Sequence, residues 1–161
     1  MLIPSKVAQE FLDGYKLLMK LMNEGEEPKD MKEYAALRAL IYEKMDDVDN
    51  LFSETIGFEF IQSLREATFG TFAFLKKYKN GYALYSLDSG NYYLCKALTS
   101  SLEEFIDPYT IIETAIVPFK GYIICDGLVL NHGVHIGKNM AKDFRDGYWS
   151  AKRDSTIVKG K

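Results

Sequence analysis

The chain has 161 residues, of which 47% are hydrophobic and 27% are charged. This length and composition predict a folded protein with a buried core, and they exclude disorder over the whole chain. The only two cysteines, Cys95 and Cys125, lie in apolar segments and form no C-x-x-C motif, which argues against a disulfide-rich scaffold or a zinc finger. No apolar run approaches membrane-spanning length, so we expect a soluble, cytoplasmic protein.

Charge is distributed unevenly along the chain. Residues 1–65 contain eight Lys or Arg and thirteen Asp or Glu, whereas residues 131–161 contain seven and three, so the first segment is acidic and the last is basic. The whole chain carries a net charge of −3. We expect this asymmetry to serve either contacts within the chain or an external partner.

The first third of the chain has the spacing of amphipathic helices. Apolar residues recur every three or four positions over residues 5–23, 30–48 and 53–65. Ser5 is a candidate N-cap for the first of these helices, and Asp30 with Glu33 forms a capping box for the second. Gly57 weakens the helical pattern of the third. We predict an acidic helical segment over residues 1–65.

From about Thr68 the apolar period changes to two, which is typical of strands. Strands are predicted over residues 69–78, 82–87, 92–98, 109–119 and 122–130. The Asn80-Gly81 pair predicts a hairpin turn between the first two, because glycine accepts the positive φ that such turns require. The pattern favours an antiparallel sheet of about five strands.

Helical spacing returns after Asn131. Four apolar residues, each four positions after the last, predict a helix that packs on the sheet: Ile136, Met140, Phe144 and Tyr148. The residues after Arg153 are predicted to form a short basic tail. The sequence thus predicts an α+β fold, with a helical segment over residues 1–65 and a sheet, C-terminal helix and tail over residues 66–161. The two parts form either separate units or one compact domain.

The strand region also resembles a known family. The segments YKNGYALYSLDSGNYYLCKAL and IIETAIVPFKGYIICDGLVL resemble a family of small bacterial proteins of unassigned function, whose members carry a segment like P-F-x-x-x-I-I-x-D-G-L. The resemblance covers about residues 69–130 and rests mainly on Pro118, Phe119, Ile123, Ile124, Asp126, Gly127 and Leu128. It implies an α+β fold with an antiparallel sheet and brings no catalytic residues.

Three residues are candidates for chemistry. Asp126 lies in an apolar strand, and His132 and His135 follow it as an H-x-x-H. Together they suit a small metal site or a general acid/base pair, as in a hydrolase or nuclease. The structural alternative, which we favour, is that Asp126 accepts hydrogen bonds from nearby amides beside Gly127 and that His135 caps the following helix. No metal site and no cofactor are predicted.

Charged side chains supply two candidate binding surfaces. A basic C-terminal set suits the backbone and bases of a nucleic acid and consists of Lys138, Lys142, Arg145 and Trp149. An acidic N-terminal set imitates nucleic-acid phosphates towards a basic partner and consists of Glu26, Glu27, Asp46 and Asp47.

The expected function is that of a non-catalytic interaction or regulatory protein rather than an enzyme. By analogy of size and acidity, it suits a small inhibitor of nucleic-acid-handling machinery encoded by a phage or mobile element, for example of the anti-CRISPR type. The expected partner is then a protein, such as a basic nucleic-acid-binding protein. The hydrolase or nuclease is the second hypothesis, and a nucleic-acid-binding module with a basic C-terminal helix is the third.

Overall fold

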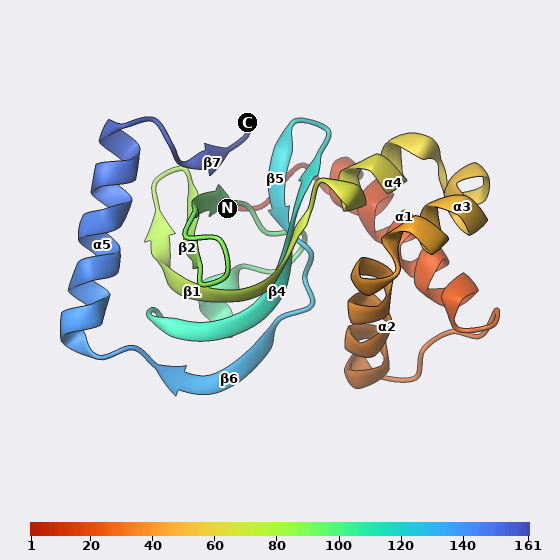
Figure 1. Ribbon diagram of the computed structural model, residues 1–161, viewed down its shortest axis with the longest axis horizontal. Coiled ribbons are helices and arrows are strands. Elements are labelled where there is room, and N and C mark those ends of the chain that lie inside the picture. The colour runs from red at the N-terminus through yellow and green to blue at the C-terminus, as the bar shows by residue number, and fades with distance from the viewer.

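The structure is a computed structural model that describes residues 1–161. Four helices come first along the chain: α1 (Ser5–Met22), α2 (Met31–Glu43), α3 (Met45–Ile56) and α4 (Phe58–Arg65). They form one end of the molecule, the strands lie in the middle, and α5 (Lys138–Arg153) stands at the opposite end (Figure 1). The predicted α+β fold is confirmed.

Helix boundaries follow from capping and from one glycine. Asp30 caps α2, since its carboxylate accepts the amide of Glu33 at 2.9 Å, while the Glu33 carboxylate accepts the amide of Lys29. Ser5 is the first residue of α1 and caps nothing, which corrects the prediction. The helices predicted over residues 30–48 and 53–65 are three in the structure, because α2 ends at Glu43 and because Gly57, with φ of 115° that side chains rarely tolerate, separates α3 from α4.

The sheet has seven strands: β1 (Thr68–Tyr78), β2 (Gly81–Ser86), β3 (Tyr92–Cys95), β4 (Thr110–Phe119), β5 (Tyr122–Cys125), β6 (Leu130–His135) and β7 (Val158–Lys159). Their order is β5-β4-β1-β2-β3-β7, with β6 also paired to β4. All pairs are antiparallel except β3 with β7. The five predicted strands are present, although β3 and β5 end earlier than predicted.

Two strands were not predicted. The segment after Asn131 was expected to be helical, but β6 continues to His135 and α5 begins only at Lys138. The predicted basic tail contains β7, in which Val158 and Lys159 pair with β3. Both strands are short or fully exposed, so neither shows the alternation of apolar and polar residues that identifies a strand in a sequence.

The sheet curls until its two sides meet. A parallel bridge joins Lys96, directly after β3, to Ile124 of β5, and two backbone hydrogen bonds of 2.9 Å support it. In spatial order the strands β1, β2, β3, β5 and β4 therefore form a nearly closed, five-stranded barrel. Its interior holds a cluster of buried side chains, including Phe72, Tyr82 and Ile112, which the 3₁₀ turn η1 (Leu102–Glu104) covers through Leu102.

The two helical parts cover the outside of this curled sheet. Residues of α1 to α4 share one core with Ala115 and Val117 of β4, so the acidic helical segment packs directly on the sheet. On the opposite side, Tyr148 of α5 packs against Ala73 and Leu75 of β1. Alternate residues of β1 and β4 thus face the barrel interior and the covering helices, as the period of a strand requires.

Candidate functional site

Asp126 lies directly after β5, between the helices and the sheet, and is 2% exposed. Its carboxylate accepts hydrogen bonds from Arg38 Nη1 at 3.1 and 3.2 Å and from the Tyr15 hydroxyl at 2.8 Å. It also accepts the Thr114 hydroxyl at 3.2 Å and the Leu128 amide at 3.0 Å. The Leu128 contact is the amide hydrogen bond that the structural interpretation predicts.

Arg38, on α2, is the partner that sequence reasoning missed. It is completely buried, and its Nη1 also donates to the carbonyl of Leu128. Nε and Nη2 have no hydrogen-bond partner, although Nη2 lies 4.0 Å from a carboxylate oxygen of Glu113. A signal existed, because Arg38 stands four residues after Tyr34 and three before Ile41, on the apolar face of its helix.

Burial dominates the electrostatics of this group. Desolvation raises the pKa of Asp126, against the opposing effect of Arg38 and of the hydrogen bonds from Tyr15 and Leu128. It also raises the pKa of Tyr15 well above its usual value, so the phenol stays protonated and donates to the carboxylate. These contacts link α1 and α2 to β4 and the end of β5, which gives Asp126 a joining role.

The two histidines lie elsewhere on the sheet. Both belong to β6, whose residues are all exposed, and His135 Nδ1 lies 3.4 Å from the Thr110 hydroxyl. No hydrogen bond connects either imidazole to Asp126, and no three His, Cys, Asp or Glu side chains are grouped to hold a metal ion. Gly137 is the N-cap residue of α5 and makes no side-chain cap, so the expected capping by His135 is wrong.

The acidic set lies at the helical end of the molecule. Glu26 and Glu27 are exposed in the loop between α1 and α2, and Asp46 and Asp47 are exposed in the first turn of α3. Asp46 forms an ion pair of 2.9 Å with Arg65, so part of the negative charge of this set is balanced within the molecule. Contact of this set with a basic protein stays a prediction.

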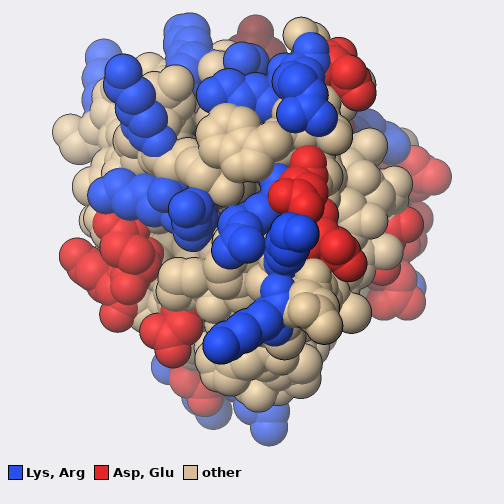
Figure 2. All heavy atoms as spheres, turned by 90° about the vertical axis from the view of Figure 1, so that its left-hand side faces the viewer, with Lys and Arg blue, Asp and Glu red and all other residues tan.

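The basic set is spread along α5. Lys138 and Lys142 lie in its first two turns, and the Arg145 guanidinium lies 6.0 Å from the ring centre of Tyr109. Trp149 lies eleven residues after Lys138, about 16 Å along the axis at 1.5 Å per residue. Figure 2 shows Lys and Arg gathered over this end of the molecule, with a smaller number of Asp and Glu among and below them. Contact of these four residues with a nucleic acid stays a prediction.

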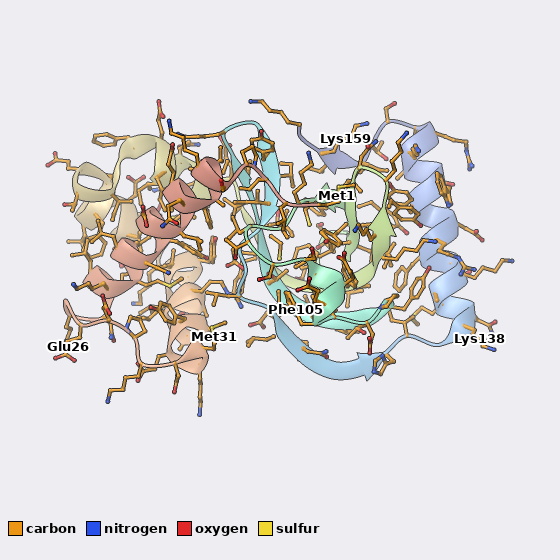
Figure 3. The ribbon with its side chains drawn as sticks, turned by 180° about the vertical axis from the view of Figure 1, so that it is seen from behind. Met1, Glu26, Met31, Phe105, Lys138 and Lys159 are labelled. Atoms are coloured by element: carbon orange, nitrogen blue, oxygen red, sulfur yellow. The ribbon has the colours of Figure 1, made fainter.

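Trp149 also lines a hollow of about 430 Å³, together with lysines from α5 and from other parts of the chain. We call this the lysine hollow. Its lysines come from the β1–β2 turn, the end of β3, the last turn of α5 and the segment around β7, and they are Lys79, Lys96, Lys152, Lys159 and Lys161. Met1 and Lys159 lie close together at this place, far from Lys138 at the other end of α5 (Figure 3).

The lysine hollow carries only positive side-chain charge. No Asp or Glu lines it, and none of its five lysines takes part in an ion pair. Burial raises the pKa of Tyr78, in its wall, to about 12, so this phenol adds no negative charge near neutral pH. The Trp149 ring is 41% exposed, and the Lys152 ammonium lies 4.9 Å from its centre. Concentrated positive charge beside an exposed ring suits an anion with flat groups.

Comparison of the chain with protein-family models, with curated proteins and with solved structures finds no match. The resemblance of residues 69–130 to a bacterial family therefore stays a prediction. None of the five helices combines the length and the apolar character that crossing a lipid bilayer requires.

Proposed function

We propose that this protein is a non-catalytic binding protein that holds a single strand of nucleic acid in the lysine hollow. The observation that carries this proposal is the convergence of five lysines, from four places in the chain, on one concave surface without an acidic side chain. Such a protein would act by occupying a nucleic acid or by competing for it, which agrees with the regulatory role expected from the sequence.

Phosphate contacts supply the affinity in this proposal. Each phosphate neutralised by a lysine releases counterions, so log K falls with log salt by about 0.7 for each contact on a single strand. If all five lysines contact phosphates, the slope approaches roughly −3.5. Because the five lysines line one hollow, a single strand that enters it meets all of them.

Trp149 favours a nucleic acid over other polyanions. Stacking of a base on an aromatic side chain is worth about 1–3 kcal/mol and tolerates any base. The Lys152 ammonium lies over the Trp149 ring, and the rings of Tyr78 and Tyr148 meet that ring at 78° and 79°, which holds its orientation. A single strand can splay its bases towards such a ring, whereas a duplex keeps its bases stacked.

The place of the lysine hollow on the barrel gives further support. It includes Lys79 of the β1–β2 turn and Lys96 after β3, and it extends towards the β4–β5 turn, where the Lys161 amide donates to the Gly121 carbonyl at 2.9 Å. Five-stranded, partly open barrels of the OB-fold type bind oligonucleotides on strands two and three and on the loops after strands one and four. This is an analogy of architecture, so function is inferred from the lysines and Trp149.

Fluorescence anisotropy with labelled oligo-dT and oligo-U at low salt tests the proposal. Reversing three charges of the hollow, in Lys79→Glu/Lys96→Glu/Lys159→Glu, should abolish measurable binding and remove about 2 units of salt slope. The matched control reverses three exposed lysines at the helical end, Lys29→Glu/Lys32→Glu/Lys44→Glu, which changes the net charge equally. Melting curves of both variants verify that the fold is intact.

The control variant should keep most of the affinity, because its lysines lie far from the hollow. An equal loss in both variants would mean that net charge, not the hollow, causes binding. Inorganic polyphosphate is the competitor that tests stacking. If it binds as tightly as an oligonucleotide of equal phosphate number, or if no oligonucleotide binds at low salt, the nucleic-acid assignment is wrong.

A further inference from the structure

A second concave surface lies at the junction of the helical segment and the sheet. It has a volume of about 510 Å³, within the range of roughly 300–1,000 Å³ typical of small-molecule sites. We call it the junction cleft. Its walls come from α1, the start of α2, the segment from Ala97 to Phe105, and the residues after β5. Met31 and Phe105 lie on its two sides (Figure 3).

The junction cleft is deep and mainly apolar. Ala97, Leu102 and Cys125 are each at most 1% exposed and form part of its lining, so the floor is closed. At the mouth, by contrast, Met31 is 58% exposed and Phe105 is 50% exposed. Burial of such exposed apolar side chains by an apolar ligand is favourable, because it removes their surface from water.

The polar groups of the junction cleft define the class of ligand. Lys16 and Glu104 contribute one charge of each sign, and neither takes part in an ion pair. Asp126 is neutralised by Arg38 and has its oxygens occupied by hydrogen bonds. The lining thus carries no net side-chain charge and offers hydrogen-bonding groups on Thr99 and Ser100.

We propose that the junction cleft binds an uncharged, mostly apolar small molecule that presents a hydrogen-bonding group to Thr99 and Ser100. The inference is independent of nucleic-acid binding, because no residue lines both surfaces. A small molecule fits better than a flat protein surface, since the lining includes the fully buried Ala97, Leu102 and Cys125, which a flat surface does not reach. Tyr15, Asp126 and Leu128 line the cleft and also join the helices to the sheet, so a ligand there contacts both parts at once.

Titration with Nile red, an uncharged apolar dye, tests the inference. The full chain should give a saturable increase in fluorescence with one dye per protein, and the dye should raise the melting temperature, because it binds the folded state. Met31→Glu/Phe105→Glu should weaken dye binding at least tenfold, since it places two charges at the mouth. The matched control, Met140→Glu/Phe58→Glu, changes two exposed side chains of the same kinds outside the cleft, at 57% and 67% exposure, and should bind as the wild type does.

Four results would overturn the inference. The first is an increase in fluorescence that does not saturate at one dye per protein, and the second is an equal loss of binding in the control variant. The third concerns charge: tighter binding of the anionic dye anilinonaphthalene sulfonate, lost in Lys16→Gln, would assign the cleft to an organic acid. The fourth concerns a second copy of the chain: a dimer in gel filtration that is abolished by Met31→Glu/Phe105→Glu would show that this copy covers the cleft.

Discussion

Removal of the Arg38 charge should be among the most destabilising single changes in this protein. In Arg38→Met the aliphatic part of the side chain is kept, but the buried Asp126 carboxylate loses its counter-charge and one of its hydrogen-bond donors. Breaking a buried pair in this way costs about 3–5 kcal/mol in the free energy of unfolding. For a chain of this length, that corresponds to a fall of roughly 6–20 °C in melting temperature.

The assay is urea unfolding followed by circular dichroism, with calorimetry for the melting temperature. Asp126→Asn should cost about as much as Arg38→Met, because it leaves the guanidinium unpaired in an apolar site. In the double variant neither charge remains, so its cost should be well below the sum of the two single costs. Arg65→Met is the control, because Arg65 pairs with Asp46 and Asp49 at the surface, where solvent screens the charges, and its loss should cost far less than that of Arg38. Additive costs, or a loss of 1 kcal/mol or less for Arg38→Met, would refute the joining role of this pair.

Two further changes test local features. Gly127→Val should destabilise the protein by more than about 1–2 kcal/mol, because Gly127 has φ of 85°. The control Gly137→Ser should change the melting temperature little, because Gly137 is the N-cap of α5, has φ of −66° and leaves no atom within 4 Å of the added Cβ. Hydrogen bonds from the Tyr82 hydroxyl and the Lys77 ammonium lower the pKa of Glu103 from 4.5 to about 2. Between these two pH values the unfolded chain binds a proton at Glu103 that the folded chain does not. The contribution of Glu103 to the free energy of unfolding is therefore present above pH 4.5 and is lost as the pH falls towards 2. Between pH 4.5 and 2 the melting temperature of the wild type should therefore fall more than that of Glu103→Gln. The difference should be small, because the Glu103 carboxylate is partly exposed. An equal fall in both proteins would contradict the assignment of this stability to Glu103.

Local signals in the sequence predicted most of the elements. The helical spacing of α1, the Asp30 cap of α2 and the Asn80-Gly81 turn depend on neighbouring residues, which a single sequence displays directly. The exposed strand β6 was not predicted, because it has no buried face and therefore no alternation of apolar and polar residues in its sequence. The strand β7 depends on pairing with β3, more than sixty residues earlier, which no local pattern reveals.

The candidate sites were harder to predict because they assemble from distant residues. Asp126 was identified because a carboxylate in an apolar strand is unusual, but its partner Arg38 is 88 residues away. Similarly, Trp149 was selected for its place in a basic helix, whereas the lysines that surround it come mainly from turns and strands. Only the curling of the sheet, through the bridge between Lys96 and Ile124, brings β3 and the β4–β5 turn to the same hollow.

Net charge alone would argue against a nucleic-acid-binding protein, since the chain carries −3. Figure 3 shows, however, that Glu26 at the helical end lies far from Lys159, which lines the lysine hollow. Screening at physiological ionic strength has a length of about 8 Å, which is far shorter than α1 alone, at about 27 Å for its 18 residues. Acidic side chains at the helical end therefore cannot cancel the potential at the lysine hollow, and a phosphate that approaches the hollow responds to the lysines around it. At close range the acidic end would repel the same phosphates, so under the proposed function the charge separation would direct a nucleic acid to the lysine hollow.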